Sequence, residues 1–191
     1  MFVADAPPLP CFALLTGLCS AVVLSSGLAT TATAQPPEYG QAPLAGSARV
    51  VDGDTFDLVH AGASSSAVRV TRIRLEGVDA CERGQTADLH GSMWPCGTIA
   101  TSWLIEQTTG ELVSCVPNQR DRWGRTIARC TARGRDLAAA GLAQGIYVAY
   151  RVKGQITDTD YGRIEEIARL GKRGIWATRF QMPWEWRRSR R

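Results

Sequence analysis

Residues 74–82 read RLEGVDACE, a stretch that joins an apolar strand to a loop with two acids. Arg74 lies near the end of an alternating apolar run, and Asp79 and Glu82 follow just beyond it. Two carboxylates three residues apart in a loop are typical of a hard-cation site, although a solvated acidic loop has the same pattern. This stretch by itself leaves both interpretations open.

Two other polar segments share this character. Residues 51–55 read VDGDT and residues 121–125 read DRWGR. The first has the composition of a turn between strands, because Gly supplies the unusual φ and Asp caps it. The second is typical of a hairpin turn, with Arg125 at the start of the returning strand. Each segment alone is weak evidence for function.

The pattern around these segments predicts five strands and three helices. The strands are expected at residues 48–51, 55–59, 68–75, 111–116 and 125–131, and the helices at residues 97–109, 136–144 and 159–170. Alternation slips between Val70 and Ile73, so we expect a bulge or bend there. Because no regular β–α alternation occurs, the order indicates a small α+β domain with an antiparallel sheet or barrel.

Length and composition exclude several classes of protein. The chain has 191 residues, 45% of them hydrophobic, and dispersed Gly and Pro, which excludes a two-domain doubly wound enzyme and a collagen-like or low-complexity chain. A net charge of +4 suits a phosphate-rich partner without identifying one.

The N-terminal segment is expected to be an export signal. Residues 6–37 carry no charge, and Thr31-Ala32-Thr33-Ala34 provides a small-residue cleavage site, so residues 1–34 are interpreted as a signal peptide. Asp5 and the absence of Lys or Arg before the apolar run leave an uncleaved anchor as the alternative. Cleavage would raise the net charge to 22 − 17 = +5, because only Asp5 is lost among the charged residues.

The remaining chain is divided by composition. We interpret residues 35–46 as a disordered leader, residues 47–180 as the domain and residues 181–191 as a basic Trp/Arg-rich tail. The tail is expected to be a solvated end, with electrostatic binding to nucleic acid as the alternative. The mature protein is expected to be periplasmic or secreted, monomeric, and without stable membrane association.

Four cysteines remain after cleavage of the signal: Cys81, Cys96, Cys115 and Cys130. In an oxidising compartment this even number implies disulfides, with three possible connectivities. A zinc site is disfavoured because the chain has no C-x-x-C pair and only two histidines.

The three polar segments together resemble the staphylococcal nuclease (thermonuclease) family. The family pattern is D-G-D-T, then R-L-x-x-[VI]-D-[AT]-P-E, then D-x-[YW]-G-R, and this chain has the three in the same order. The resemblance covers about residues 47–180, including Gly-Ile-Trp at 174–176. It implies an α+β fold, a five-stranded oligonucleotide/oligosaccharide-binding (OB-fold) β-barrel with three α-helices.

The resemblance also implies a calcium site and a water-activating residue. Asp54 and Asp79 match the calcium-ligating carboxylates, and Ala80 matches the position whose backbone carbonyl also ligates. Glu82 matches the residue that activates or positions the attacking water. An all-oxygen ligand set suits Ca²⁺.

Arginines and aromatic residues are assigned to the substrate. Arg74 and Arg125 match the two guanidinium groups that hold the scissile phosphate, where paired donors are needed. Arg122 is a candidate for a further phosphate contact, and Tyr150 or Trp123 for stacking on a base. Solvated charge and core aromatic are the alternative interpretations of these three residues.

The chain departs from the family at Cys81, where the family has Pro. Exported members often have two cysteine pairs, but the usual loop partner is replaced here by Ala87. We therefore expect Cys81 to pair with Cys96, and Cys115 to pair with Cys130 across two strands. The alternative is a free thiol at Cys81 and a loose loop.

The resemblance implies an exported, calcium-dependent nuclease that hydrolyses DNA and RNA with low sequence specificity, leaving 3′-phosphate and 5′-hydroxyl ends. The alternative is a catalytically weak or inactive nucleic-acid-binding or scaffold domain of the same fold, and a third possibility is a disulfide-stapled structural domain. Catalysis is favoured because the chain keeps the whole set of matching residues: Asp54, Arg74, Asp79, Glu82 and Arg125.

Overall fold

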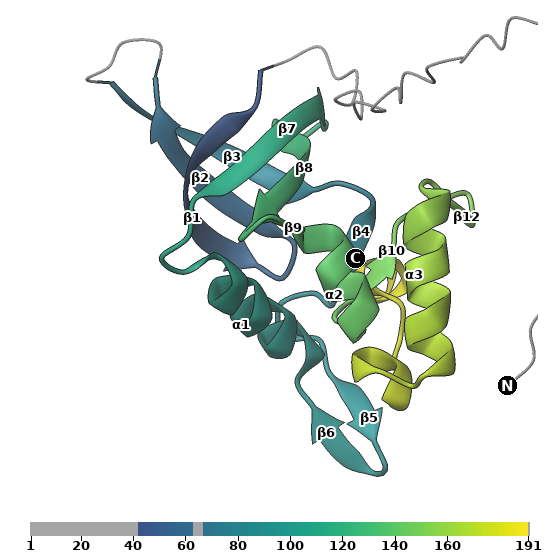
Figure 1. Ribbon diagram of the computed structural model, residues 1–191. Coiled ribbons are helices and arrows are strands. Elements are labelled where there is room, and N and C mark those ends of the chain that lie inside the picture. The colour runs from purple at the N-terminus through teal and green to yellow at the C-terminus, as the bar shows by residue number, and fades with distance from the viewer. Residues whose placement is uncertain (1–41, 63–66, 191) are drawn as a thin grey trace, which may run out of the picture. The chain divides into compact units, whose positions relative to one another are not determined.

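Five strands form a closed barrel in the computed structural model, which describes residues 42–62 and 67–190 (Figure 1). The strands are β1 (Leu44–Asp52), β2 (Thr55–Ala61), β3 (Val68–Leu75), β7 (Val113–Arg120) and β8 (Thr126–Ala132). They are ordered β3-β2-β1-β7-β8, and parallel pairing of β3 with β8 closes the ring. The expected OB-fold barrel is confirmed. The expected signal peptide, residues 1–34, lies outside the described residues.

The barrel begins slightly earlier than the sequence predicts. Leu44 is paired with Cys115 at the start of β1, although residues 35–46 are expected to be a leader. Pairing with β7 satisfies the backbone groups of residues 44–46, whose Pro- and Gly-rich surroundings in the sequence favour a loop. Residues 35–41 of that leader lie outside the described part of the chain.

The bulge expected between Val70 and Ile73 is absent. Strands β2 and β3 pair without a shift from Thr55 and Arg74 to Ala61 and Val68. Residues 68–70 are exposed, so no buried face imposes alternation on them. The break in the alternation of apolar and polar residues thus marks the point at which β3 passes from exposed to buried residues. Register shifts occur instead in β1 and in β7.

Four α-helices accompany the barrel within residues 42–62 and 67–190. They are α1 (Cys96–Thr108), α2 (Leu137–Gln144), α3 (Thr159–Leu170) and α4 (Pro183–Ser189), with the 3₁₀ helix η1 (Gly174–Ala177) before the last. The first three match the expected helices. Helix α4 was not expected, since its residues were interpreted as a solvated end. None of the helices in the described residues is long and apolar enough to cross a membrane.

Helix α1 packs against β1 at one end of the barrel, and α2 and α3 pack beside β10 (Tyr147–Ala149) (Figure 1). Asp136 caps α2 by accepting a hydrogen bond from the amide of Ala139, and Gly145 ends it in the left-handed conformation, with φ of 69°. The main core is formed by the inward faces of the barrel strands with α1, α2 and β10.

Short strands complete the fold. Strand β4 (Val78–Ala80) pairs with β10, and the hairpin of β5 (Ala87–Leu89) and β6 (Ser92–Trp94) projects beyond α1 (Figure 1). β9 (Arg135–Asp136) extends the sheet beside β8, and β11 (Arg151–Val152) pairs with β12 (Gln155–Ile156).

Two disulfides with the expected pairing join the four cysteines of the described residues. Cys115 and Cys130 are register partners in β7 and β8, with their Cα atoms 4.1 Å apart. Cys81 and Cys96 link the end of β4 to the start of α1, with their Cα atoms 5.7 Å apart. This second bond lies in a small core of its own, which includes Ile175 of η1.

Candidate active site

The three polar segments surround one cavity of about 660 Å³. Its wall comes from the β1–β2 turn, the end of β3, the loop after β4, the β7–β8 turn, the segment after β10 and helix α4. The barrel therefore brings together segments that are far apart in the sequence. The predicted site residues that line the cavity are Asp54, Arg74, Ala80, Cys81, Glu82, Trp123, Arg125 and Tyr150, whereas the fully buried Asp79 does not line it.

Arg74 joins the two acids that were predicted to bind metal. Its side chain lies at the end of β3, and its Nη1 donates to Oδ2 of Asp54 at 3.0 Å while Nη2 donates to Oδ1 of Asp79 at 2.8 Å. All three residues are buried, with exposed fractions of 8% for Arg74, 8% for Asp54 and 0% for Asp79. Burial acts to lower the pKa of Arg74, but the two carboxylates outweigh it and raise that pKa.

Asp79 lies in a strand, whereas the sequence indicated a loop. It is the middle residue of β4, and Val148 of β10 is its register partner. The expectation failed because residues 78–80 are too few to show a pattern, and their strand forms only by pairing with a segment about 70 residues away. The consequence is a carboxylate on a firm backbone.

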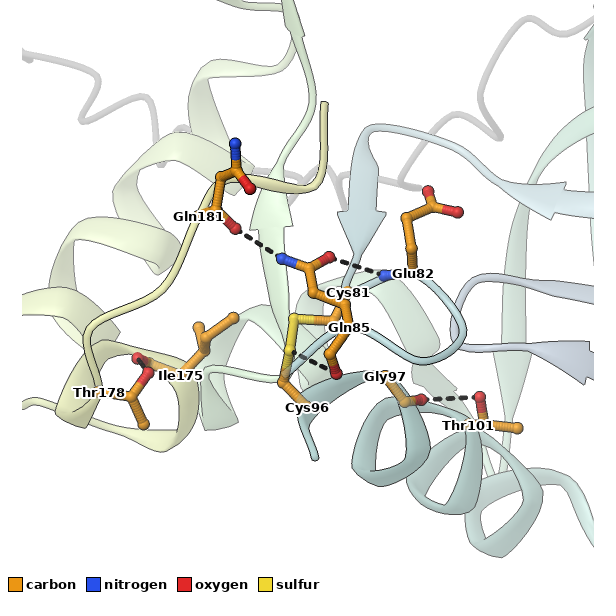
Figure 2. Close-up of a disulfide and its surroundings, with 9 residues drawn as sticks. All are labelled: Cys81, Glu82, Gln85, Cys96, Gly97, Thr101, Ile175, Thr178 and Gln181. Atoms are coloured by element: carbon orange, nitrogen blue, oxygen red, sulfur yellow. Dashed lines mark hydrogen bonds between the residues drawn. A yellow bond between two sulfur atoms is a disulfide. The ribbon is translucent and has the colours of Figure 1, made fainter. Parts of the chain in front are cut away.

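Glu82 follows on a loop that is held from several sides. The disulfide of Cys81 is adjacent to it, and its backbone amide donates to Oε1 of the buried Gln85 at 3.0 Å. Gly97 packs so tightly against this loop that a Cβ there would lie 2.0 Å from the carbonyl oxygen of Glu82. Figure 2 shows the carboxylate of Glu82 pointing away from the disulfide. The disulfide and Gln85 thus restrain the loop where the family has Pro.

Arg125 is oriented by the turn that precedes it. Its Nε donates to Oδ2 of Asp121 at 2.6 Å, and Oδ1 of Asp121 accepts from the backbone amides of Trp123 and Arg125. Within the described part of the chain, no hydrogen bond is made by the two terminal nitrogens of Arg125. They remain available for a ligand in the cavity, which Arg125 lines.

The aromatic candidates are not core residues. Trp123 is 63% exposed and Tyr150 is 38% exposed, so the core interpretation is wrong for both. Trp123 lies in the β7–β8 turn with the guanidinium groups of Arg122 and Arg125 over its ring, at 4.2 and 5.1 Å from the centroid. Arg122 is exposed and does not line the cavity.

Arg187, which was not predicted as a site residue, reaches into the site from helix α4. Its Nη1 and Nη2 donate to Oδ1 and Oδ2 of Asp79 at 2.9 and 2.7 Å, and Nη1 also pairs with Glu82. The hydrogen bond to Asp79, with Glu82 adding to it, raises the pKa of Arg187. Pro183 at the first turn and Glu185 at N3 are helix-start signals that could have predicted α4, but no local signal links it to Asp79.

The donor set fits a hard cation by its chemistry. The carboxylates of Asp54 and Asp79 and the backbone carbonyl of Ala80 are all oxygen donors, which Ca²⁺ prefers. Arg187 already brings a positive charge to Asp79 and Glu82. Among residues 42–62 and 67–190, no group of three or more His, Cys, Asp or Glu side chains is arranged to hold a metal ion by itself. A cation here would need the carbonyl and water as further ligands.

The site carries excess negative charge. Asp52 lies at the cavity beside Asp54, and burial, followed by repulsion from Asp54, raises its pKa. Burial and the charges of Asp54 and Asp52 likewise raise the pKa of Tyr147 well above its usual value. Such an electrostatic environment favours a cationic ligand.

Comparison with known proteins finds one matching family model and several similar proteins. Residues 72–178 match the family model described as "Staphylococcal nuclease homologue". The chain is 29% identical over 151 residues to a micrococcal nuclease of Shigella flexneri, covering 74% of this chain and 78% of that protein. It is 30% identical to protein ParB of Escherichia coli, covering 74% and 77% of the two chains. It is 32% identical to a probable staphylococcal-like nuclease of Oryza sativa subsp. japonica, covering 63% of this chain and 33% of that protein.

Proposed function

The chain belongs to the staphylococcal nuclease family, whose members are metal-using hydrolases that act as endonucleases on nucleic acid, and from this premise we propose that it is an exported, calcium-dependent nuclease. Its substrates are DNA and RNA, cleaved with low sequence specificity. The observation that carries the proposal is the placing of Arg74, Arg125 and Glu82 around one cavity, beside Asp54 and Ala80.

The arginines bind the scissile phosphate. Arg125 has its terminal nitrogens free of hydrogen bonds within the described residues, and Asp121 holds its Nε, so the guanidinium is oriented before substrate arrives. Arg74 lies deeper, between Asp54 and Asp79, and contributes positive charge at the cavity wall. Donors fixed in place stabilise the charge that develops on the phosphoryl oxygens without reorganising.

Glu82 acts on the attacking water. Its carboxylate lines the cavity, and it is attached to the loop that the disulfide and Gln85 restrain. A carboxylate in this place accepts a proton from water as the water attacks phosphorus, and the proton then leaves with the solvent or the departing oxygen. The departing group is the 5′ oxygen of the next nucleotide, so the products are a 3′-phosphate and a 5′-hydroxyl.

Asp54, Asp79 and the carbonyl of Ala80 would hold calcium. A bound calcium ion supplies positive charge that offsets the charge of the phosphodiester and lowers the pKa of a coordinated water. The protein provides the fixed oxygen donors: Asp79 is held in β4, and Asp54 accepts from the hydroxyl of Thr55 at 2.9 Å.

Low sequence specificity follows from what lines the cavity. Arginines contact phosphate, which is the same in every nucleotide, and the exposed aromatic side chains of Trp123 and Tyr150 at the cavity can stack on any base. Two disulfides and the apolar N-terminal segment support export to the periplasm or medium. We expect a monomer that does not stay on a membrane after signal cleavage.

Digestion of plasmid DNA and of RNA tests the proposal. The wild type, Glu82→Gln and Arg125→Ala are compared with calcium and with chelator, and Arg163→Ala, an exposed arginine of α3, serves as control. We expect a loss of roughly 100-fold or more in both site variants and in chelator, and little change in the control. Equal activity in all samples would contradict the site assignment, and binding of nucleic acid without any cleavage would favour the scaffold alternative.

A further inference from the structure

Arg187 is held against the acids of the site by the fold of the C-terminal segment. The segment before it is anchored twice: the side-chain amide of Gln85 donates to the carbonyl of Gln181 at 2.6 Å, and Asp88 and Arg179 exchange two backbone hydrogen bonds of 2.8 Å (Figure 2 shows the first). Figure 2 also shows how this bond ties the C-terminal segment to the Glu82 loop. These contacts position helix α4 so that Arg187 faces the cavity.

Arg187 occupies the oxygens that a metal ion would need. Oδ1 of Asp79 accepts from both Arg74 and Arg187, and Oδ2 accepts from Arg187. Glu82 is its other partner. These hydrogen bonds use three of the about four lone-pair positions of the Asp79 carboxylate, which is fully buried, so a cation reaches both of its oxygens only when Arg187 gives up its place. Arg74 is almost fully buried, whereas the side chain of Arg187 is 35% exposed, so Arg187 is the partner that can withdraw toward solvent.

The charges around the cavity also indicate that Arg187 opposes the binding of a cation. Asp52, Asp54 and Glu82 line the cavity and Asp79 lies buried behind it, so four carboxylates lie in this region. Arg74 and Arg187 offset two of them, and the positive charge of Arg187 repels an incoming divalent ion. Loss of Arg187 would leave the carboxylates unopposed at their outer side, which costs stability without metal and favours binding of a cation.

We infer that Arg187 is a tethered counter-cation of the metal carboxylates. It neutralises Asp79 and Glu82 while no divalent cation is bound, and it is displaced from Asp79 when calcium binds. Helix α4 thereby lowers the calcium affinity of the site and keeps the acids in position before the metal arrives. This inference rests on the calcium site of the proposed function.

Calcium titration of the oxidised full chain by isothermal calorimetry tests the inference. Wild type, Arg187→Gln and Arg188→Gln are compared at one pH and ionic strength. Arg188 is the matched control because it is the next residue of α4, is exposed, and has no ion pair within the described residues. We expect Arg187→Gln to bind calcium at least about tenfold more tightly than wild type, and Arg188→Gln to stay within about twofold.

Thermal unfolding provides a readout that does not depend on activity. In chelator we expect Arg187→Gln to have a lower Tm than wild type and than Arg188→Gln, and calcium at saturation to remove this difference. If Arg187→Gln does not fold in chelator, Arg187→Lys is measured in its place. This variant keeps the positive charge but loses the paired guanidinium donors, so we expect it to bind calcium more tightly than wild type by a smaller factor.

The outcomes separate the two proposals. Wild-type calcium affinity in Arg187→Gln and Arg187→Lys, or a weaker affinity, would overturn the inference and leave the calcium site intact. An absence of calcium binding in the wild type as well would overturn the calcium site and the inference with it.

Discussion

The two disulfides allow one prediction to be worked through with a matched control. Each bond joins cysteines 15 residues apart, so each closes a loop of the same length. The chain-entropy relation gives about 3 kcal/mol for a loop of that size. Replacing Cys81 and Cys96 by Ala, or Cys115 and Cys130 by Ala, should therefore lower the free energy of unfolding by similar amounts.

The two disulfides differ in the parts of the structure that surround them. Cys115 and Cys130 are already paired in a long hairpin of the barrel, whereas Cys81 immediately precedes Glu82 on a loop that, besides the disulfide, is held by Gln85 and by packing against Gly97. Loss of the first pair leaves the site geometry intact. Loss of the Cys81–Cys96 bond removes one of the restraints on the segment that aims Glu82, and a misplacement of about 1 Å can cost on the order of 100-fold in rate.

The assay combines urea unfolding, followed by tryptophan fluorescence, with cleavage of a labelled oligonucleotide at saturating calcium. For a domain of this size about 3 kcal/mol corresponds to a fall of roughly 6–12 °C in Tm, so rates are measured at a temperature where both variants stay folded. We expect kcat to fall at least about tenfold in the Cys81→Ala, Cys96→Ala variant only. Equal losses of activity in both folded variants would refute the positioning role, and stability losses below about 1 kcal/mol in both would refute the entropic estimate.

Three further predictions concern other parts of the chain. Gly97→Ala should destabilise the fold by roughly 1–3 kcal/mol and lower kcat, because the new Cβ meets the carbonyl of Glu82; urea unfolding and cleavage rates check this. The hydrogen bond from Arg72 holds the pKa of Asp57 below its usual range, so Asp57→Asn should lower the free energy of unfolding by less than about 1 kcal/mol at neutral pH. Wild-type Asp57 loses this stabilisation when it is protonated, so the difference in stability between wild type and Asp57→Asn should disappear as the pH falls below about 3.8. Unfolding measured at several pH values checks this. Trp123→Ala should weaken binding of single strands by about 1–3 kcal/mol with little change in Tm, measured by fluorescence anisotropy in calcium-free buffer.

Much of the fold was predictable because its signals are local. Alternation and Gly stops located the first three helices and the barrel strands to within a few residues. The three motifs contain Asp54, Arg74, Glu82 and Arg125, which line the cavity, since each motif is a tight turn or a strand end whose geometry depends largely on its own residues. The pairing of Cys81 with Cys96 was also inferred correctly, from the family pattern and the absence of a cysteine at Ala87.

Other features were fixed only by contacts between distant segments. The strand of Asp79 exists because β10 pairs with it, and the exposure of residues 68–70 mimicked a bulge that the paired register excludes. Arg187 is the clearest case, because 108 residues separate it from Asp79. The sequence of a charged C-terminal segment looks the same whether the segment is exposed to solvent or packed against the domain. The outcome depends on how the segment of Arg179 and Gln181 is anchored, which is a property of packing and cannot be read from a local pattern.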